Sequence, residues 1–78
     1  MTIEQVRAVH HERPFRPFTI HLADGRAYDV PHPDFLAFAP SGRMVFVSRP
    51  DDSVGIVDVL LVTDLVIHPT VPANGPPS

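Results

Sequence analysis

The segment from Phe18 to Val30, FTIHLADGRAYDV, constrains the fold of this chain more than any other segment. Apolar and polar residues alternate on both sides of Asp24-Gly25, which is the pattern of two strands that each bury one face. Glycine readily adopts the positive φ angle that tight hairpin turns require. The segment therefore predicts a β-hairpin with its turn at Asp24-Gly25.

The length of the hairpin loop follows from which residues would share a face. A two-residue loop would set Ile20 opposite Asp29, so that an apolar and a charged side chain would lie together. A three-residue loop at 23–25 sets Ile20 opposite Tyr28 and gathers the apolar residues of both strands on one face. We therefore predict a type I turn followed by Gly25 as the left-handed bulge residue.

The residues before the hairpin predict one short amphipathic helix. Thr2 and Gln5 have the spacing of a capping box, and apolar residues then recur at helical spacing. The helix should end near residues 11–12, because a proline follows closely. The next segment, RPFRPF at 13–18, has two interpretations: a rigid connector whose Phe15 closes one end of the core, or an exposed proline-aromatic ligand for a partner.

Further short strands are predicted after the hairpin, at 35–39, 44–48, 54–57 and 62–67. Turn residues separate them, and a one-turn break is expected at 58–61. One helix followed by several short strands is typical of a small barrel. We therefore predict a mainly β fold over residues 1–68, a small SH3-like or Sm-like barrel of five to six short antiparallel strands with one N-terminal α-helix. The proline-rich residues 69–78 predict a disordered tail.

Two resemblances accompany these patterns. The run LADGR at 22–26, which follows a helix, and the segment 57–67 resemble the first and final strands of Sm-like barrels. The RNA-contacting Asn and Arg-Gly of the Sm motifs are not recognisable, and the chain has no lysine for the lysine-histidine motif of bacterial Sm-like riboregulators. No RNA-binding residue is therefore carried over. The pattern PFRPFxIHLADGR, HPDF, SGR and VDxLLVT is similar to a group of short bacterial proteins without an assigned function, which implies a free-standing small domain.

Size and charge narrow the function classes. A chain of 78 residues without cysteine has a small core and no disulfide to support it, so self-association is a reasonable source of further burial. The net charge is −3 and the only fixed side-chain cations are arginines, which is unfavourable for non-specific nucleic-acid binding. The sequence has no apolar run long enough to cross a membrane and no signal-peptide pattern at its start, so a cytoplasmic location is expected.

The sequence contains no obvious catalytic or metal-binding set. The five histidines lack H-x-x-x-H or H-x-H spacing, and a metal site would need three or four ligands to converge. Asp58 and Asp64 each stand in an apolar run, where we interpret them as turn caps or solvent-facing edge residues, because no base or nucleophile is set beside them. We expect no catalytic residue, no metal and no cofactor, and therefore no enzyme.

Two surfaces are candidates for binding. Arg26 and Arg43 each follow a turn glycine and are candidate contacts for an anion or a nucleic acid. The apolar run VGIVDVLLV has no proline and would aggregate as an open edge unless it were covered. We expect the association surface at Val54, Ile56, Val57 and Val59. The predicted function is a non-catalytic module that self-associates through an edge strand or binds a protein partner; the alternative is Sm-like RNA binding.

Overall fold

The N-terminal helix begins where its capping residues predict, and it ends at His10, just before the predicted end near residues 11–12. The structure, a computed structural model, describes residues 1–69. Helix α1 spans Ile3–His10, and the Thr2 hydroxyl accepts from the backbone N–H of Gln5 while the Gln5 side chain accepts from the backbone N–H of Thr2. These reciprocal bonds satisfy two donors that the first helical turn leaves free, so the predicted capping box is confirmed. The predicted tail at 69–78 lies outside the described residues, apart from Pro69.

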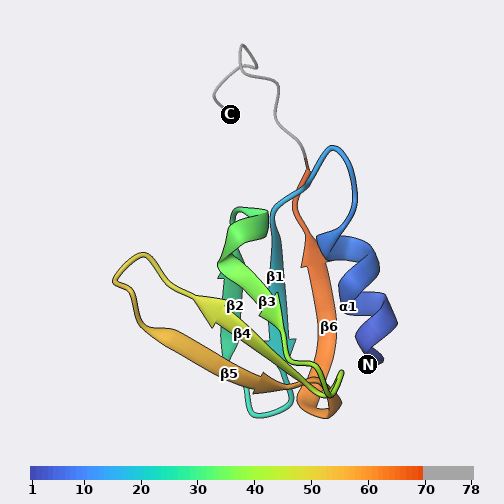
Figure 1. Cartoon of the computed structure of the whole chain (residues 1–78), viewed down its shortest axis with the longest axis vertical. Helices are drawn as coiled ribbons and strands as arrows, with labels where there is room; N and C mark the ends of the chain where they lie inside the picture. The colour runs from blue at the N-terminus through green and yellow to red at the C-terminus, as the bar shows by residue number, and fades with distance from the viewer. Residues whose placement is uncertain (70–78) are drawn as a thin grey trace.

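Within residues 1–69, six strands follow the helix in two three-stranded antiparallel sheets (Figure 1). The elements in chain order are β1 Phe18–Leu22, β2 Ala27–Val30, the 3₁₀ turn η1 Pro33–Phe35, β3 Leu36–Phe38, β4 Met44–Ser48, β5 Val54–Asp58, the 3₁₀ turn η2 Val59–Leu61, and β6 Val62–Ile67. One sheet has the order β2-β1-β6 and the other β3-β4-β5. A mainly β fold with one N-terminal helix is thus confirmed, whereas closure of the two sheets into a barrel stays a prediction.

The first hairpin has the predicted register. Ile20 lies opposite Tyr28, and the backbone N–H of Leu22 donates to the carbonyl of Arg26 at 2.9 Å. The backbone N–H of Gly25 closes the turn onto Leu22 at 3.0 Å, and Gly25 has a φ of 92°. The predicted three-residue loop with a left-handed glycine is therefore confirmed.

The turn between β4 and β5 repeats this geometry with an aspartate in place of the glycine. The backbone N–H of Asp52 donates to Arg49, and that of Arg49 donates to Ser53, both at 2.9 Å. Asp52 has a φ of 69°, a conformation that costs an L-amino acid free energy and that Asp tolerates better than most residues.

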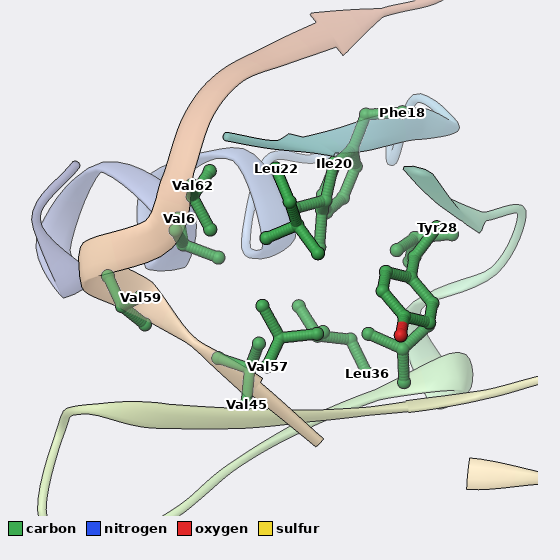
Figure 2. Close-up of a cluster of buried hydrophobic side chains, with 12 residues drawn as sticks. Val6, Phe18, Ile20, Leu22, Tyr28, Leu36, Val45, Val57, Val59 and Val62 are labelled. Carbon is green, nitrogen blue, oxygen red and sulfur yellow. The ribbon is translucent and has the colours of Figure 1, made fainter. Parts of the chain in front are cut away.

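The core lies between the two sheets (Figure 2). Side chains of β1 point toward those of β4 and β5, and Val6 of α1 fills one side with no exposed surface. The buried apolar residues are Val6, Phe18, Ile20, Leu22, Tyr28, Val30, Leu36, Val45, Val47, Val57, Val59 and Val62. Phe15 is half-buried against this cluster, with its ring centroid 6.0 Å from that of Phe18, which favours the connector interpretation of the RPFRPF segment.

Tyr28 joins the two sheets across the core. Its ring packs against Gly55 of β5, and its hydroxyl accepts from Nη1 of Arg26 at 3.3 Å. The guanidinium of Arg49 lies over the same ring, 4.6 Å from the centroid, in a cation–π contact. A β2 side chain thus contacts both β5 and the β4–β5 turn, although β2 and β5 belong to different sheets.

Candidate functional site

The β3-β4-β5 sheet presents an apolar outer face to solvent. Ile56 pairs with Phe46, and Phe46 pairs with Ala37, so these side chains form one row across the three strands. Val54 is 57% exposed and Ile56 60% exposed, which is far more than core residues of the same kinds. We define the outer face as Ala37, Met44, Phe46, Val54 and Ile56.

Strand β5 is also the open edge of its sheet. It pairs with β4 only, and no backbone bond from Val54 or Ile56 to another element is present within residues 1–69. Arg49 and Ser53 form a hydrogen-bonded pair at one end of the β4–β5 ladder, and Val59 donates to Arg43 at the other end. Hydrogen-bonded and non-hydrogen-bonded pairs alternate along an antiparallel ladder, so Val54 and Ile56 point their backbone groups away from β4.

Half of the predicted association surface lies inside the core. Val57 is 2% exposed and Val59 is 3% exposed, so neither side chain is available to a partner, and their assignment to the surface was wrong. Along a strand, side chains alternate between faces, so Val57 points inward when Ile56 points outward. Val59 is the first residue of η2, which turns its side chain back into the core. The alternation in VGIVD could have separated Val54 and Ile56 from Val57.

Further exposed apolar side chains lie outside the outer face. Leu60 and Leu61 of η2 are 68% and 48% exposed, and Val66 and Ile67 of β6 are also exposed. The backbone N–H of Leu60 donates to the carboxylate of Asp58 at 2.9 Å, which confirms the interpretation of Asp58 as a turn cap. The leucines of η2 are therefore held at a fixed turn, next to the end of β5.

Arg26 and Arg43 lie at the same end of the molecule. The β1–β2 loop and the β3–β4 loop lie at this end together with the β5–β6 connection (Figure 1). The backbone N–H of Ala23 donates to Leu61, and that of Val59 donates to Arg43, so both loops are bonded to η2. Each guanidinium contacts a carboxylate of its own chain, since Arg26 Nε lies 2.7 Å from an oxygen of Asp24. Arg43 Nη2 lies 3.5 Å from Asp58.

The Asp24–Arg26 pair shows how these charges are balanced. The backbone N–H of Arg26, and after it the guanidinium, hold the pKa of Asp24 below its ordinary value, while Asp24 raises the pKa of Arg26. The hairpin tip therefore carries one cation and one anion in contact. Neither Arg26 nor Arg43 is a free cation that could contribute its full charge to binding a phosphate.

A polar cluster on the outer side of the β2-β1-β6 sheet escaped the sequence analysis. Thr19 is only 8% exposed, and its hydroxyl lies 2.7 Å from Asp29 Oδ1 and 2.8 Å from His68 Nε2. A hydroxyl has one proton, and an ionised carboxylate can only accept, so Thr19 donates to Asp29 and accepts from a protonated Nε2 of His68. These residues line an open pocket of about 420 Å³ whose walls include Pro17 and Pro31.

The order of contacts in this cluster differs from that of a catalytic triad. In a triad the carboxylate orients the imidazole, and the imidazole accepts the proton of the hydroxyl. Here Asp29 contacts the hydroxyl of Thr19 directly, and His68 donates to that hydroxyl. The cluster therefore ties β1 to β2 and to the residue after β6. Strand alternation places Thr19 on the side away from the core, and no local signal reveals that Asp29 and His68 cover it.

His10 ties α1 to η1. Its Nε2 lies 2.8 Å from the carbonyl of Pro33, so this nitrogen donates, and Nδ1 is buried without a hydrogen-bond partner in the described structure. The ring stacks edge-on against Phe38 at 5.3 Å. Within residues 1–69, no three His, Cys, Asp or Glu side chains are grouped in a way that could hold a metal ion.

The function of this chain is inferred from the geometry of the structure. None of the helices in residues 1–69 has the length and apolar character needed to span a bilayer. Searches against family models, curated proteins and solved structures found nothing that matches this chain.

Proposed function

We propose that this protein is a non-catalytic module that associates with a second copy of itself through β5. The proposal is carried by the exposure of Val54 and Ile56 on a strand whose outer edge has no backbone partner within residues 1–69. An open apolar edge of this kind is a site for pairing with another strand.

The energetics favour covering this edge. In a paired ladder, Val54 and Ile56 of each copy would contact side chains of the facing strand, and a cross-strand pair of apolar residues contributes about 0.2–1 kcal/mol. Pairing would also satisfy backbone groups that are otherwise left to water. A domain of 78 residues has little stability to spare, so such a contribution would be significant.

We further propose that the two sheets form an open SH3-like barrel. Strand β6 pairs antiparallel with β1, and a 3₁₀ turn precedes it. Tyr28 contacts Gly55 across the gap between the sheets. In such a barrel, β5 would lie beside the opening between the two sheets. Its outer edge would then face solvent, because no strand would pair with it there.

Light scattering coupled to size exclusion at micromolar concentrations tests the association. We expect an oligomer for the natural chain and a monomer for Ile56→Glu, because strand pairing would bring the new carboxylates of the two copies close together, and opposed like charges destabilise a ladder. Val66→Glu is the matched control: Val66 is also an exposed aliphatic residue but lies on β6 of the other sheet, so this variant should still associate. A monomeric natural chain, or equal loss in both variants, would contradict the proposal.

Sm-like RNA binding receives less support from this geometry. The two arginines that were its candidate contacts are each paired with an aspartate, and the chain is acidic overall. Binding of single-stranded RNA that weakens steeply with salt would revive it.

A further inference from the structure

We infer that two copies pair β5 with β5 in antiparallel orientation about a two-fold axis at Ile56, which would join the two β3-β4-β5 sheets into one of six strands. This inference rests on the proposed self-association and specifies its geometry. It follows from the direction of the backbone groups of β5, from the charges at its two ends, and from the row of side chains on the outer face.

The backbone of β5 restricts the pairing to a few registers. Val54, Ile56 and Asp58 alternate with the residues that bond to β4, so their N–H and carbonyl groups face the open edge. In an antiparallel pair these edge-facing residues must lie opposite edge-facing residues of the second copy. An axis at Val54 or Asp58 would pair only one residue of β5 with β5 of the second copy, so a symmetric pair that uses the strand has its axis at Gly55, at Ile56 or at Val57.

Only the axis at Ile56 pairs every residue of β5 with a residue of β5 in the second copy. It also keeps aspartates of the two copies from lying opposite each other. It sets Ile56 opposite Ile56 and Val54 opposite Asp58, so all five residues of β5 are paired. An axis at Gly55 would set Asp58 opposite Asp52 of the second copy, and opposed like charges destabilise a ladder. An axis at Val57 would pair Val54 with a residue of η2, where the strand has already ended.

The side chains of the outer face support the same register. In one copy Ala37, Phe46 and Ile56 form a row across the sheet. The axis at Ile56 places the two rows end to end, which gives an uninterrupted apolar row across six strands. Asp58, which would lie beside Val54 of the second copy, already has Arg43 and the backbone N–H of Leu60 as partners, so its carboxylate stays balanced.

The acidic residues near the two ends of β5 do not face one another in this arrangement. Asp51 and Asp52 lie in the turn before β5, and Arg43 lies at the other end of the β4–β5 ladder, where it contacts Asp58. Antiparallel pairing brings the acidic turn of each copy toward the end that carries Arg43 in the other. The contact uses the same surface of both copies, so it closes at two and does not extend into a fibre.

The outer strands of the combined sheet are the two copies of β3, which has three residues and lies between Pro33 and Pro40. A short edge strand beside prolines is a poor template for further pairing.

Cysteine cross-linking tests the register, and the chain has no cysteine of its own to interfere. With the axis at Ile56, the two Cα atoms of that residue lie about 5.5 Å apart, which suits a disulfide. Ile56→Cys should therefore form a covalent dimer under mild oxidation. Val54→Cys alone is the matched control and should not, because the two Val54 positions are four residues out of register, or about 13 Å apart.

Each outcome of this experiment separates the register from the association itself. An equimolar mixture of the Val54→Cys and Ile56→Cys chains that forms mixed disulfides, with no Ile56 homodimer, would place the axis at Gly55 and overturn the inference. A natural chain that is dimeric by light scattering but whose Ile56→Cys variant never cross-links overturns the register and leaves the proposed function standing. A natural chain that is monomeric by light scattering contradicts both the register and the proposed self-association. Contacts between Ile56 side chains in an isotope-filtered NMR spectrum of mixed labelled and unlabelled natural chains provide a second measurement, without substitution.

Discussion

The ring of Tyr28 lies directly on Gly55, at the point where β2 of one sheet faces β5 of the other. A Cβ atom built on Gly55 would lie 2.5 Å from Cε1 of the ring, which is closer than real Cβ contacts allow. The absence of a side chain at Gly55 is therefore what lets Tyr28 span the two sheets.

Gly55→Ala should destabilise the fold by about 1–3 kcal/mol, because the added methyl group must displace the ring or the strand. Urea unfolding followed by circular dichroism measures the change. The penalty should shrink in a chain that also carries Tyr28→Leu, which removes the ring. An unchanged midpoint for Gly55→Ala alone would show that the ring is not held against the glycine.

Asp52→Gly should stabilise the protein by about 0.5–1 kcal/mol. Asp52 occupies the left-handed conformation with a φ of 69°, where glycine avoids the steric cost that an L-residue bears. The matched control is Asp51→Gly, which should be destabilising because Asp51 Oδ1 accepts from the backbone N–H and the hydroxyl of Ser53 at 3.0 and 2.6 Å. Thermal unfolding of both variants checks the two signs, and a lower midpoint for Asp52→Gly would contradict this account.

Thr19→Val should cost about 1–2 kcal/mol of stability, since it keeps the shape of the side chain but removes the hydroxyl between Asp29 and His68. Nitrogen-15 spectra of the imidazole provide a more specific readout. In the natural chain at neutral pH, Nε2 of His68 should carry the proton, and this preference should weaken in the variant. A His68 ring with its proton on Nδ1 alone would contradict the donor assignment.

Acid should destabilise the protein through carboxylates on its surface. The side chain of Arg16 lowers the pKa of Glu12, the backbone N–H of Arg26 lowers that of Asp24, and the hydroxyl of Ser53 lowers that of Asp51. A depressed pKa in the folded state means that these groups stabilise the fold above the unfolded pKa of about 4. That contribution is lost as the pH falls through the folded values.

Urea midpoints measured from pH 7 downward should therefore decrease below about pH 4. The Asp24→Asn variant has one such carboxyl fewer and should show a shallower decrease over the same interval. A decrease of equal steepness in both proteins would show that Asp24 has no part in it.

Local sequence patterns predicted most helices and strands, but they did not predict contacts between segments that are distant in the sequence. Gly25 and the alternation around it determine the first hairpin, because both act within a few residues. The end of β5 was placed one residue early, at Val57, since Asp58 is both its last residue and the cap of η2.

The parts that could not be predicted depend on distant pairing. Thr19 and His68 are 49 positions apart, and only the ladder between β1 and β6 brings them together. Tyr28 and Gly55 meet because the two sheets face each other, which no local pattern specifies. The burial of Val57 could have been predicted from the alternation of side chains along β5. The burial of Val59 could not, because Val59 lies beyond the strand, in η2.

The position of β1 in the middle of its sheet has a consequence for how the chain folds as it is made. One neighbour, β2, follows within a few residues, but the other is β6, the last strand of the described residues. During synthesis the first hairpin would emerge with one side of β1 open, and that side stays open until residues 62–67 have left the ribosome. Folding that waits for such a distant partner is slow compared with that of helical domains of this size. We expect the growing chain to depend most on chaperones during this interval, because the unpaired edge of β1 could pair with other chains.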